Sequence, residues 1–104
     1  MIFIETTIFT RLVQELLTDD EYRELQTALI LQPDLGSVIP GSGGLRKIRW
    51  SYGGKGKRGG VRVIYYLATL ERILMVYIYS KRKQDDLTPD QLKRLRRIIE
   101  EQRS

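Results

Sequence analysis

Residues 73–79 constrain the fold most, because this segment is apolar at odd and even positions alike, apart from its tyrosine hydroxyls. A strand with this pattern is buried on both faces, so we expect it to be an interior strand of a sheet. Residues 61–68 are rich in β-branched and aromatic side chains and predict a neighbouring strand. Residues 45–50 predict a third strand that is half exposed. Three consecutive strands of this kind favour an antiparallel meander.

Helix signals lie on both sides of these strands. Thr18 and Glu21 form a capping box, which predicts a helix that ends before Pro33. Residues 88–91 combine a capping threonine, a proline at the first helical position and a glutamine two residues later, and predict the last helix. A shorter helix follows Thr6 or Thr7, either of which can cap it. The inward positions expected for the first two helices are Ile8, Leu12 and Leu16, and then Tyr22, Leu25, Leu29 and Ile30.

The element order defines the expected fold class. A short apolar strand at residues 2–4 precedes the two helices, the three strands and the last helix. This β-α-α-β-β-β-α order predicts an α+β fold, in which two amino-terminal helices and one carboxy-terminal helix pack on an antiparallel sheet. A chain of 104 residues is long enough for one core and short for two, so we expect residues 1–104 to form a single domain.

The composition excludes several kinds of site. The chain has no cysteine and no histidine, which rules out disulfides, the usual zinc sites and imidazole catalysis. The acids Asp85, Asp86 and Asp90 suit the start of a helix, so we expect neither a metal nor a cofactor. The amino terminus has no basic leader, and no apolar run approaches the roughly 20 residues of a membrane span. We therefore expect a cytoplasmic protein without a membrane partner.

The charges are distributed unevenly along the chain. The net charge is +5, but residues 1–40 carry seven acids and only two bases. Residues 41–64 reverse this balance with seven bases and no acid. Clustered lysine and arginine indicate a polyanionic partner, because cations that meet phosphates release condensed counterions.

A glycine-rich basic segment, GGKGKRGG at residues 53–60, contains the dinucleotide-binding pattern G-x-G-x-x-G. That pattern binds a pyrophosphate only when it leads from a strand into a helix, and here it leads into another strand. The segment is also not a Walker A loop, because no Gly-Lys pair is followed by serine or threonine. The segment is therefore expected to be a flexible loop that contacts an extended nucleic acid.

The strands on either side of this loop carry further cations. Alternation puts Lys47 and Arg49 on one face, about 7 Å apart. If the hairpin closes through the loop, Arg62 falls near the level of Arg49, so that three cations converge. A second cluster follows the third strand and consists of Lys81, Arg82 and Lys83.

Two segments, GLRKIRWSYGGKGKRGGVRVIYYL and VYIYSKRKQDDL, resemble the RelE superfamily of toxins from bacterial type II toxin–antitoxin systems. Within it they resemble the HigB-like branch, whose loop is long and lysine-rich. The resemblance implies a small α+β ribonuclease that cleaves mRNA in the ribosomal A site without metal. It also implies a cognate antitoxin, a helix-turn-helix protein that masks the basic cleft. The toxin would then contact operator DNA only through this antitoxin. The catalytic positions that the resemblance implies are Lys47, Arg49, Arg62, Lys81 and Arg82.

The chemistry assigns these cations separate roles. Cleavage by the 2′-hydroxyl needs a proton acceptor, charge stabilisation on the phosphorane and a proton for the 5′ oxygen. Arg62 and Arg49 suit charge stabilisation, Lys47 is a candidate base, and Lys81 or Arg82 would lie by the leaving oxygen. Residues expected to bind RNA without catalysing are Arg46, Lys55, Lys57, Arg58, Lys83, Tyr52 and Tyr79. Several relatives place a catalytic tyrosine, histidine or glutamate near residues 84–88, where this chain reads QDDLT, so the proton acceptor stays open.

Two other functions fit the same charges. A non-catalytic regulator that binds RNA or DNA would protect RNA and leave it intact. A ParE-like relative of the same architecture would poison gyrase and cut no RNA. Retention of Lys47, Arg62 and the Lys81-Arg82 pair favours the nuclease.

Overall fold

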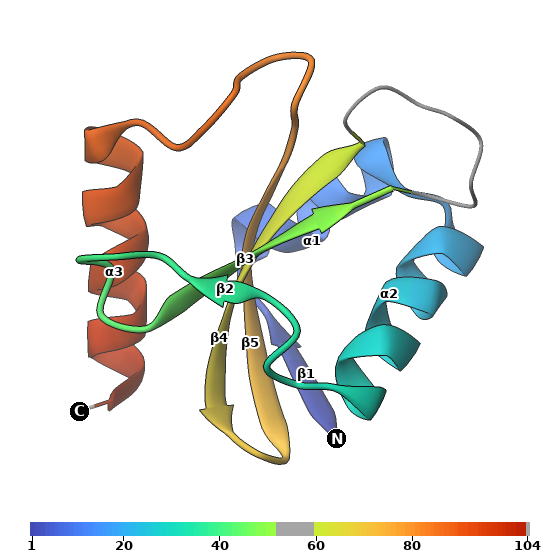
Figure 1. Ribbon diagram of the computed structural model, residues 1–104, viewed down its shortest axis with the longest axis horizontal. Helices are drawn as coiled ribbons and strands as arrows, with labels where there is room; N and C mark the ends of the chain where they lie inside the picture. The colour runs from blue at the N-terminus through green and yellow to red at the C-terminus, as the bar shows by residue number, and fades with distance from the viewer. Residues whose placement is uncertain (52–59, 104) are drawn as a thin grey trace.

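The computed structural model of the protein describes residues 1–51 and 60–103. These residues form three helices and five strands (Figure 1). In chain order the elements are β1 (Ile2–Glu5), α1 (Thr7–Leu16), α2 (Asp19–Leu31), β2 (Ser37–Val38), β3 (Leu45–Trp50), β4 (Val61–Thr69), β5 (Arg72–Ser80) and α3 (Pro89–Arg103).

The strands form one sheet in the order β1-β5-β4-β3-β2. The antiparallel β3-β4-β5 meander and the interior position of β5 are as predicted. Two features were not predicted: β1 lies beside β5 and runs parallel to it, and the two-residue strand β2 extends the sheet beyond β3. The α+β class is therefore confirmed, and the sheet is mixed with one more strand than expected.

One side of the sheet, the α1/α2 face, is covered by the two amino-terminal helices (Figure 1). The Thr6 hydroxyl caps α1 by accepting a hydrogen bond from Phe9 N, and the predicted capping box of α2 is present. Helix α1 buries Phe9 and Val13, whereas Ile8, predicted to face inward, is exposed. The apolar stripe of α1 is thus shifted by one residue, because hydrophobic side chains occupy adjacent positions and the contact with the sheet selects among them.

A buried tyrosine fixes the connection between α2 and β2. The Tyr65 hydroxyl donates to Pro33 O and accepts from Gly36 N, both at 2.8 Å. A Cβ at Gly36 would lie 2.8 Å from the Tyr65 ring, so only glycine lets the backbone approach this closely. In α2 itself, Leu25 and Leu29 are buried as predicted and Ile30 is exposed.

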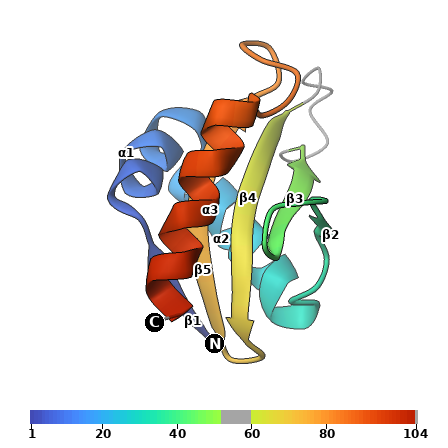
Figure 2. The ribbon, with the colours of Figure 1, turned by 90° about the vertical axis from the view of Figure 1, so that its left-hand side faces the viewer.

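The opposite side of the sheet, the α3 face, is covered by the last helix (Figure 2). Helix α3 begins with the predicted capping box: Thr88 N donates to Gln91 Oε1, and Gln91 N donates to Thr88 Oγ1. Leu95 and Ile99 of α3 pack with apolar residues of the sheet that include Leu45 of β3. Toward the other end of β3, the same face carries charged side chains.

A candidate nucleic-acid interface on the sheet

The register of the meander aligns cations from two strands. Arg49 of β3 lies directly opposite Arg62 of β4, and Arg62 lies opposite Tyr79 of β5. Lys47 shares a face with Arg49, because side chains alternate along a strand. Lys47, Arg49 and Arg62 therefore form one group on the α3 face, called here the cationic cluster. The expected alignment of Arg62 with Arg49 is confirmed.

The two arginines differ in their surroundings. Arg49 is exposed, whereas Arg62 is only 5% exposed. The Arg62 guanidinium donates to Val61 O at 3.4 Å and contributes to the electrostatic environment of Tyr79. The Arg62 guanidinium is thus a buried positive charge held in place at the base of the cluster, and the Arg49 guanidinium is a positive charge that solvent can reach.

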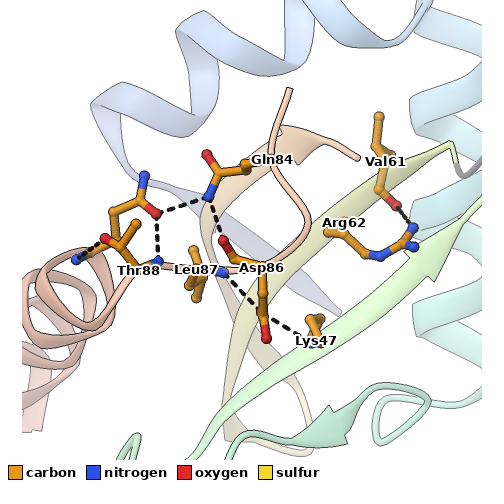
Figure 3. Close-up of polar contacts among 8 residues, drawn as sticks. Lys47, Val61, Arg62, Gln84, Asp86, Leu87 and Thr88 are labelled. Carbon is orange, nitrogen blue, oxygen red and sulfur yellow. Dashed lines mark hydrogen bonds and ion pairs between the residues drawn. The ribbon is translucent and has the colours of Figure 1, made fainter. Parts of the chain in front are cut away.

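Lys47 contacts a carboxylate that sequence reasoning assigned only to the start of the last helix. Its Nζ lies 3.3 Å from Asp86 Oδ1 (Figure 3). The same oxygen accepts a hydrogen bond from Leu87 N at 2.8 Å. The hydrogen bond from Leu87 and the interaction with Lys47 lower the pKa of Asp86 below its ordinary value. No spacing in the sequence signals this contact, which joins residues 39 positions apart.

The segment that carries Asp86 is tied to the start of α3. Gln84 Nε2 donates to Asp86 O at 2.8 Å and to Gln91 Oε1 at 2.9 Å (Figure 3). Gln91 Oε1 also accepts from Thr88 N, within the capping box. The cap of α3 therefore helps to position Asp86 over the cationic cluster.

Tyr79 lies beside this contact and is only 4% exposed. Its burial raises the pKa of Tyr79 to about 12; the Asp86 carboxylate acts in the same direction and the Arg62 guanidinium opposes it. Within the described part of the chain, its buried hydroxyl makes no hydrogen bond of good geometry. The ring packs against Tyr77, with centroids 5.9 Å apart. This burial leaves little surface of the Tyr79 ring for the RNA contact expected from the sequence.

An open pocket of about 580 Å³ borders the cationic cluster. Strand β2 pairs only with residues 46–47 of β3, so the rest of that edge has no neighbouring strand among the described residues. The pocket is lined by Leu35, Ser37, Lys47, Ile48, Arg49 and Trp50. Two cations of the cluster thus border a concave surface with apolar walls.

The remaining predicted cations take different places. Lys81, Arg82 and Lys83 are exposed in the turn after β5. Lys81 N donates to Gly60 O, which places this turn at the end of the sheet nearest Arg62.

The Arg46 guanidinium donates to Gly36 O at 2.7 Å and thereby secures the connection between α2 and β2. Arg46 is therefore not brought together with the cationic cluster. The other predicted RNA-binding residues, Tyr52, Lys55, Lys57 and Arg58, lie outside the described residues.

The fold agrees with a comparison with known proteins. A family model described as the RelE toxin of the RelE / RelB toxin–antitoxin system matches residues 5–103. The match includes every strand that contributes to the cationic cluster. The protein belongs to the RelE toxin family, and is thus a toxin of a kind that is paired with an antitoxin.

Metal sites and membrane-spanning helices are two further features considered for the described part of the chain. In residues 1–51 and 60–103, no group of three or more acidic, histidine or cysteine side chains is arranged to hold a metal ion. None of the helices in that part of the chain has the length and apolar character of a membrane-spanning helix.

Proposed function

We propose that the protein is an endoribonuclease that cleaves mRNA in the ribosomal A site and so inhibits translation. The observation that carries this proposal is the convergence of Lys47, Arg49 and Arg62 on one face beside an open pocket. Cations held on neighbouring strands suit a ribose-phosphate backbone, which presents charges at regular intervals. Members of the RelE family are generally endoribonucleases, which supports the same reaction here.

The proposed reaction uses the 2′-hydroxyl of RNA as the nucleophile and needs no metal. Attack on the adjacent phosphorus gives a cyclic phosphate and adds negative charge to the phosphorane. The forked donors of the exposed Arg49 suit contact with that charge, and the Arg62 guanidinium, only 5% exposed, would add a positioned positive charge beneath it. Lys81 or Arg82, in the turn after β5, would lie by the departing 5′ oxygen. Lys47, the base expected from sequence, lies with its Nζ 3.3 Å from Asp86 Oδ1, so its ammonium already has an anionic partner, which weakens that assignment.

The proposed partners follow from this reaction. The chain has no histidine, the side chain whose ordinary pKa suits proton transfer at neutral pH, so the enzyme would depend on the ribosome to position its substrate. A cognate helix-turn-helix antitoxin would cover the cationic cluster and make the contacts with operator DNA. The cytoplasm, where mRNA is translated, would be the site of action. Membership of the HigB-like branch is part of the same proposal.

Replacing Arg62 tests the proposal on translating ribosomes. Cleavage of mRNA should fall at least about tenfold in Arg62→Ala, which corresponds to about 1.4 kcal/mol or more in the barrier. Arg62→Lys should recover only part of the rate, because lysine keeps the charge and loses the fork. Arg94→Ala, on the exposed surface of α3, is the control for a loss of one positive charge. Thermal unfolding of each variant separates lost activity from lost folding.

The wild-type protein decides between the proposal and its alternatives. A non-catalytic regulator would protect RNA from added nuclease and produce no new ends. A gyrase poison would leave mRNA whole and cause DNA breaks. New mRNA ends within codons, formed only when the protein is added to translating ribosomes, support the proposed reaction.

A further inference from the structure

We infer that Asp86 is the proton acceptor of the cleavage reaction and takes the proton of the attacking 2′-hydroxyl. This inference rests on the proposed nuclease function and assigns the one role that the sequence leaves open. It starts from the position of the Asp86 carboxylate, which contacts Lys47 of the cationic cluster and acts electrostatically on Tyr79.

The first support is that this carboxylate is both accessible and held in place. The Asp86 side chain is 68% exposed, so a substrate can reach it. Leu87 N fixes Oδ1 at 2.8 Å, and Gln84 joins the backbone of Asp86 to the capping box of α3. Lys47 contacts the same Oδ1, so Oδ2 is the oxygen to which we assign proton uptake.

The second support is the charge around Asp86. Lys47 of β3 faces it directly, Tyr79 of β5 lies beside it, and Arg62 of β4 lies opposite Tyr79 in the sheet. The carboxylate is ionised at neutral pH, as an aspartate of ordinary pKa also is, and the ionised form is the one that accepts a proton. A low pKa also makes it a weak base, which agrees with an enzyme that relies on positioning for much of its rate.

The third support is the coupling between Asp86 and Lys47. While Asp86 is ionised, it neutralises the Lys47 ammonium at close range. Once Asp86 has accepted a proton it is neutral, and the full charge of Lys47 faces the phosphorane at the stage when negative charge has increased there. Proton transfer and electrostatic stabilisation are thereby linked in one pair of residues.

The 2′ O–H bond breaks and its proton joins an Asp86 oxygen. The 2′ oxygen forms a bond to phosphorus, and the bond between phosphorus and the 5′ oxygen breaks with its electron pair on that oxygen. The 5′ oxygen then takes a proton from the Lys81 ammonium. Asp86 returns its proton to solvent, and Lys81 regains one.

A competing role for Asp86 makes the opposite prediction. Its carboxylate could act as a counter-ion that occupies Lys47 until an RNA phosphate displaces it. Removal of the negative charge would then strengthen RNA binding and speed cleavage. The proton-acceptor role requires cleavage to slow even though RNA binding does not weaken.

The test compares Asp86→Asn with Asp85→Asn, which changes the net charge equally at the neighbouring exposed position. Single-turnover cleavage of mRNA on ribosomes should fall at least about tenfold in D86N, within the range of general base catalysis, and less than about twofold in D85N. Binding of single-stranded RNA should be unchanged or tighter in both variants. Asparagine retains an oxygen for Leu87 N, so the segment keeps its anchor.

Rescue by a small carboxylate separates proton transfer from a structural role. Formate added to Asp86→Gly should restore cleavage in proportion to its concentration, and chloride at equal ionic strength should not. Cleavage by D86N at the wild-type rate or faster would overturn the inference, as would a slow D86G enzyme that formate does not rescue. If the wild-type protein itself does not cut mRNA on ribosomes, the proposed nuclease function fails instead.

Discussion

The two faces of the sheet are built from the same strands but differ in what lies above them. On the α1/α2 face, two helices cover a continuous apolar cluster that includes Ile48 and Val63, which lie opposite each other in β3 and β4. On the α3 face, one register step away, Arg49 lies opposite Arg62. Alternation along β3 and β4 thus gives one side apolar contacts and the other side a pair of like charges.

This difference separates the source of stability from the candidate site. Buried apolar area contributes most of the favourable free energy of folding, and the α1/α2 face supplies a large share of it. Like charges directly opposite each other in a sheet are destabilising. The cationic cluster therefore lowers stability locally, and the apolar face behind it offsets that cost.

Truncation of Phe9 tests the stabilising face and should have the largest effect. Phe9 is fully buried in α1, so Phe9→Ala should lower the free energy of unfolding by about 3–5 kcal/mol. Ile8→Ala, the exposed neighbour, should cost less than about 1 kcal/mol. Urea denaturation of both variants measures the difference. Equal losses would mean that the apolar stripe of α1 is not the one described.

Removal of the Tyr65 hydroxyl tests a polar contact within the same apolar face. Tyr65→Phe leaves Gly36 N and Pro33 O without the partner they share, so the free energy of unfolding should fall by about 1–3 kcal/mol. Tyr77→Phe is the matched control, because among residues 1–51 and 60–103 the Tyr77 hydroxyl accepts only a long contact of 3.5 Å from Gln91. An equal loss of unfolding free energy in Tyr77→Phe would mean that the hydrogen bonds of the Tyr65 hydroxyl have no special role in stability.

Substitution of Arg49 on the cationic cluster should have the smallest effect on stability and a clear effect on binding. Arg49→Ala should change the free energy of unfolding by less than about 0.5 kcal/mol, because the side chain is exposed. RNA binding should weaken, and the slope of log affinity against log salt should decrease in magnitude by about 1. Titrations of single-stranded RNA at several salt concentrations measure this slope. An unchanged slope would exclude Arg49 from phosphate contact.

The parts of the fold that were predicted correctly depend on local patterns. Both capping boxes formed where Thr18 and Thr88 indicated them, because their hydrogen bonds span only three residues. Arg62 could be aligned with Arg49 because β3 and β4 follow each other in the sequence and pair antiparallel. These are short-range constraints, and neighbouring residues determine them.

The features that were missed depend on contacts between distant parts of the chain. The pairing of β1 with β5, the contact of Asp86 with Lys47 and the use of Arg46 to hold a loop all need the tertiary structure. The choice of Phe9 over Ile8 was missed for a related reason, since the sheet determines which side of α1 is buried. Spacing alone carries no information on such contacts.

The parallel pairing of β1 with β5 has a consequence for synthesis of the chain. Ile2 pairs with Arg72, and the Thr6 hydroxyl donates to Val76 O, so the first strand finds its partner about 70 residues later. A ribosome must therefore release most of the chain before its beginning can join the sheet. Prematurely terminated fragments that lack β5 leave the apolar surface of α1 without its cover, which makes them targets for chaperones and proteases.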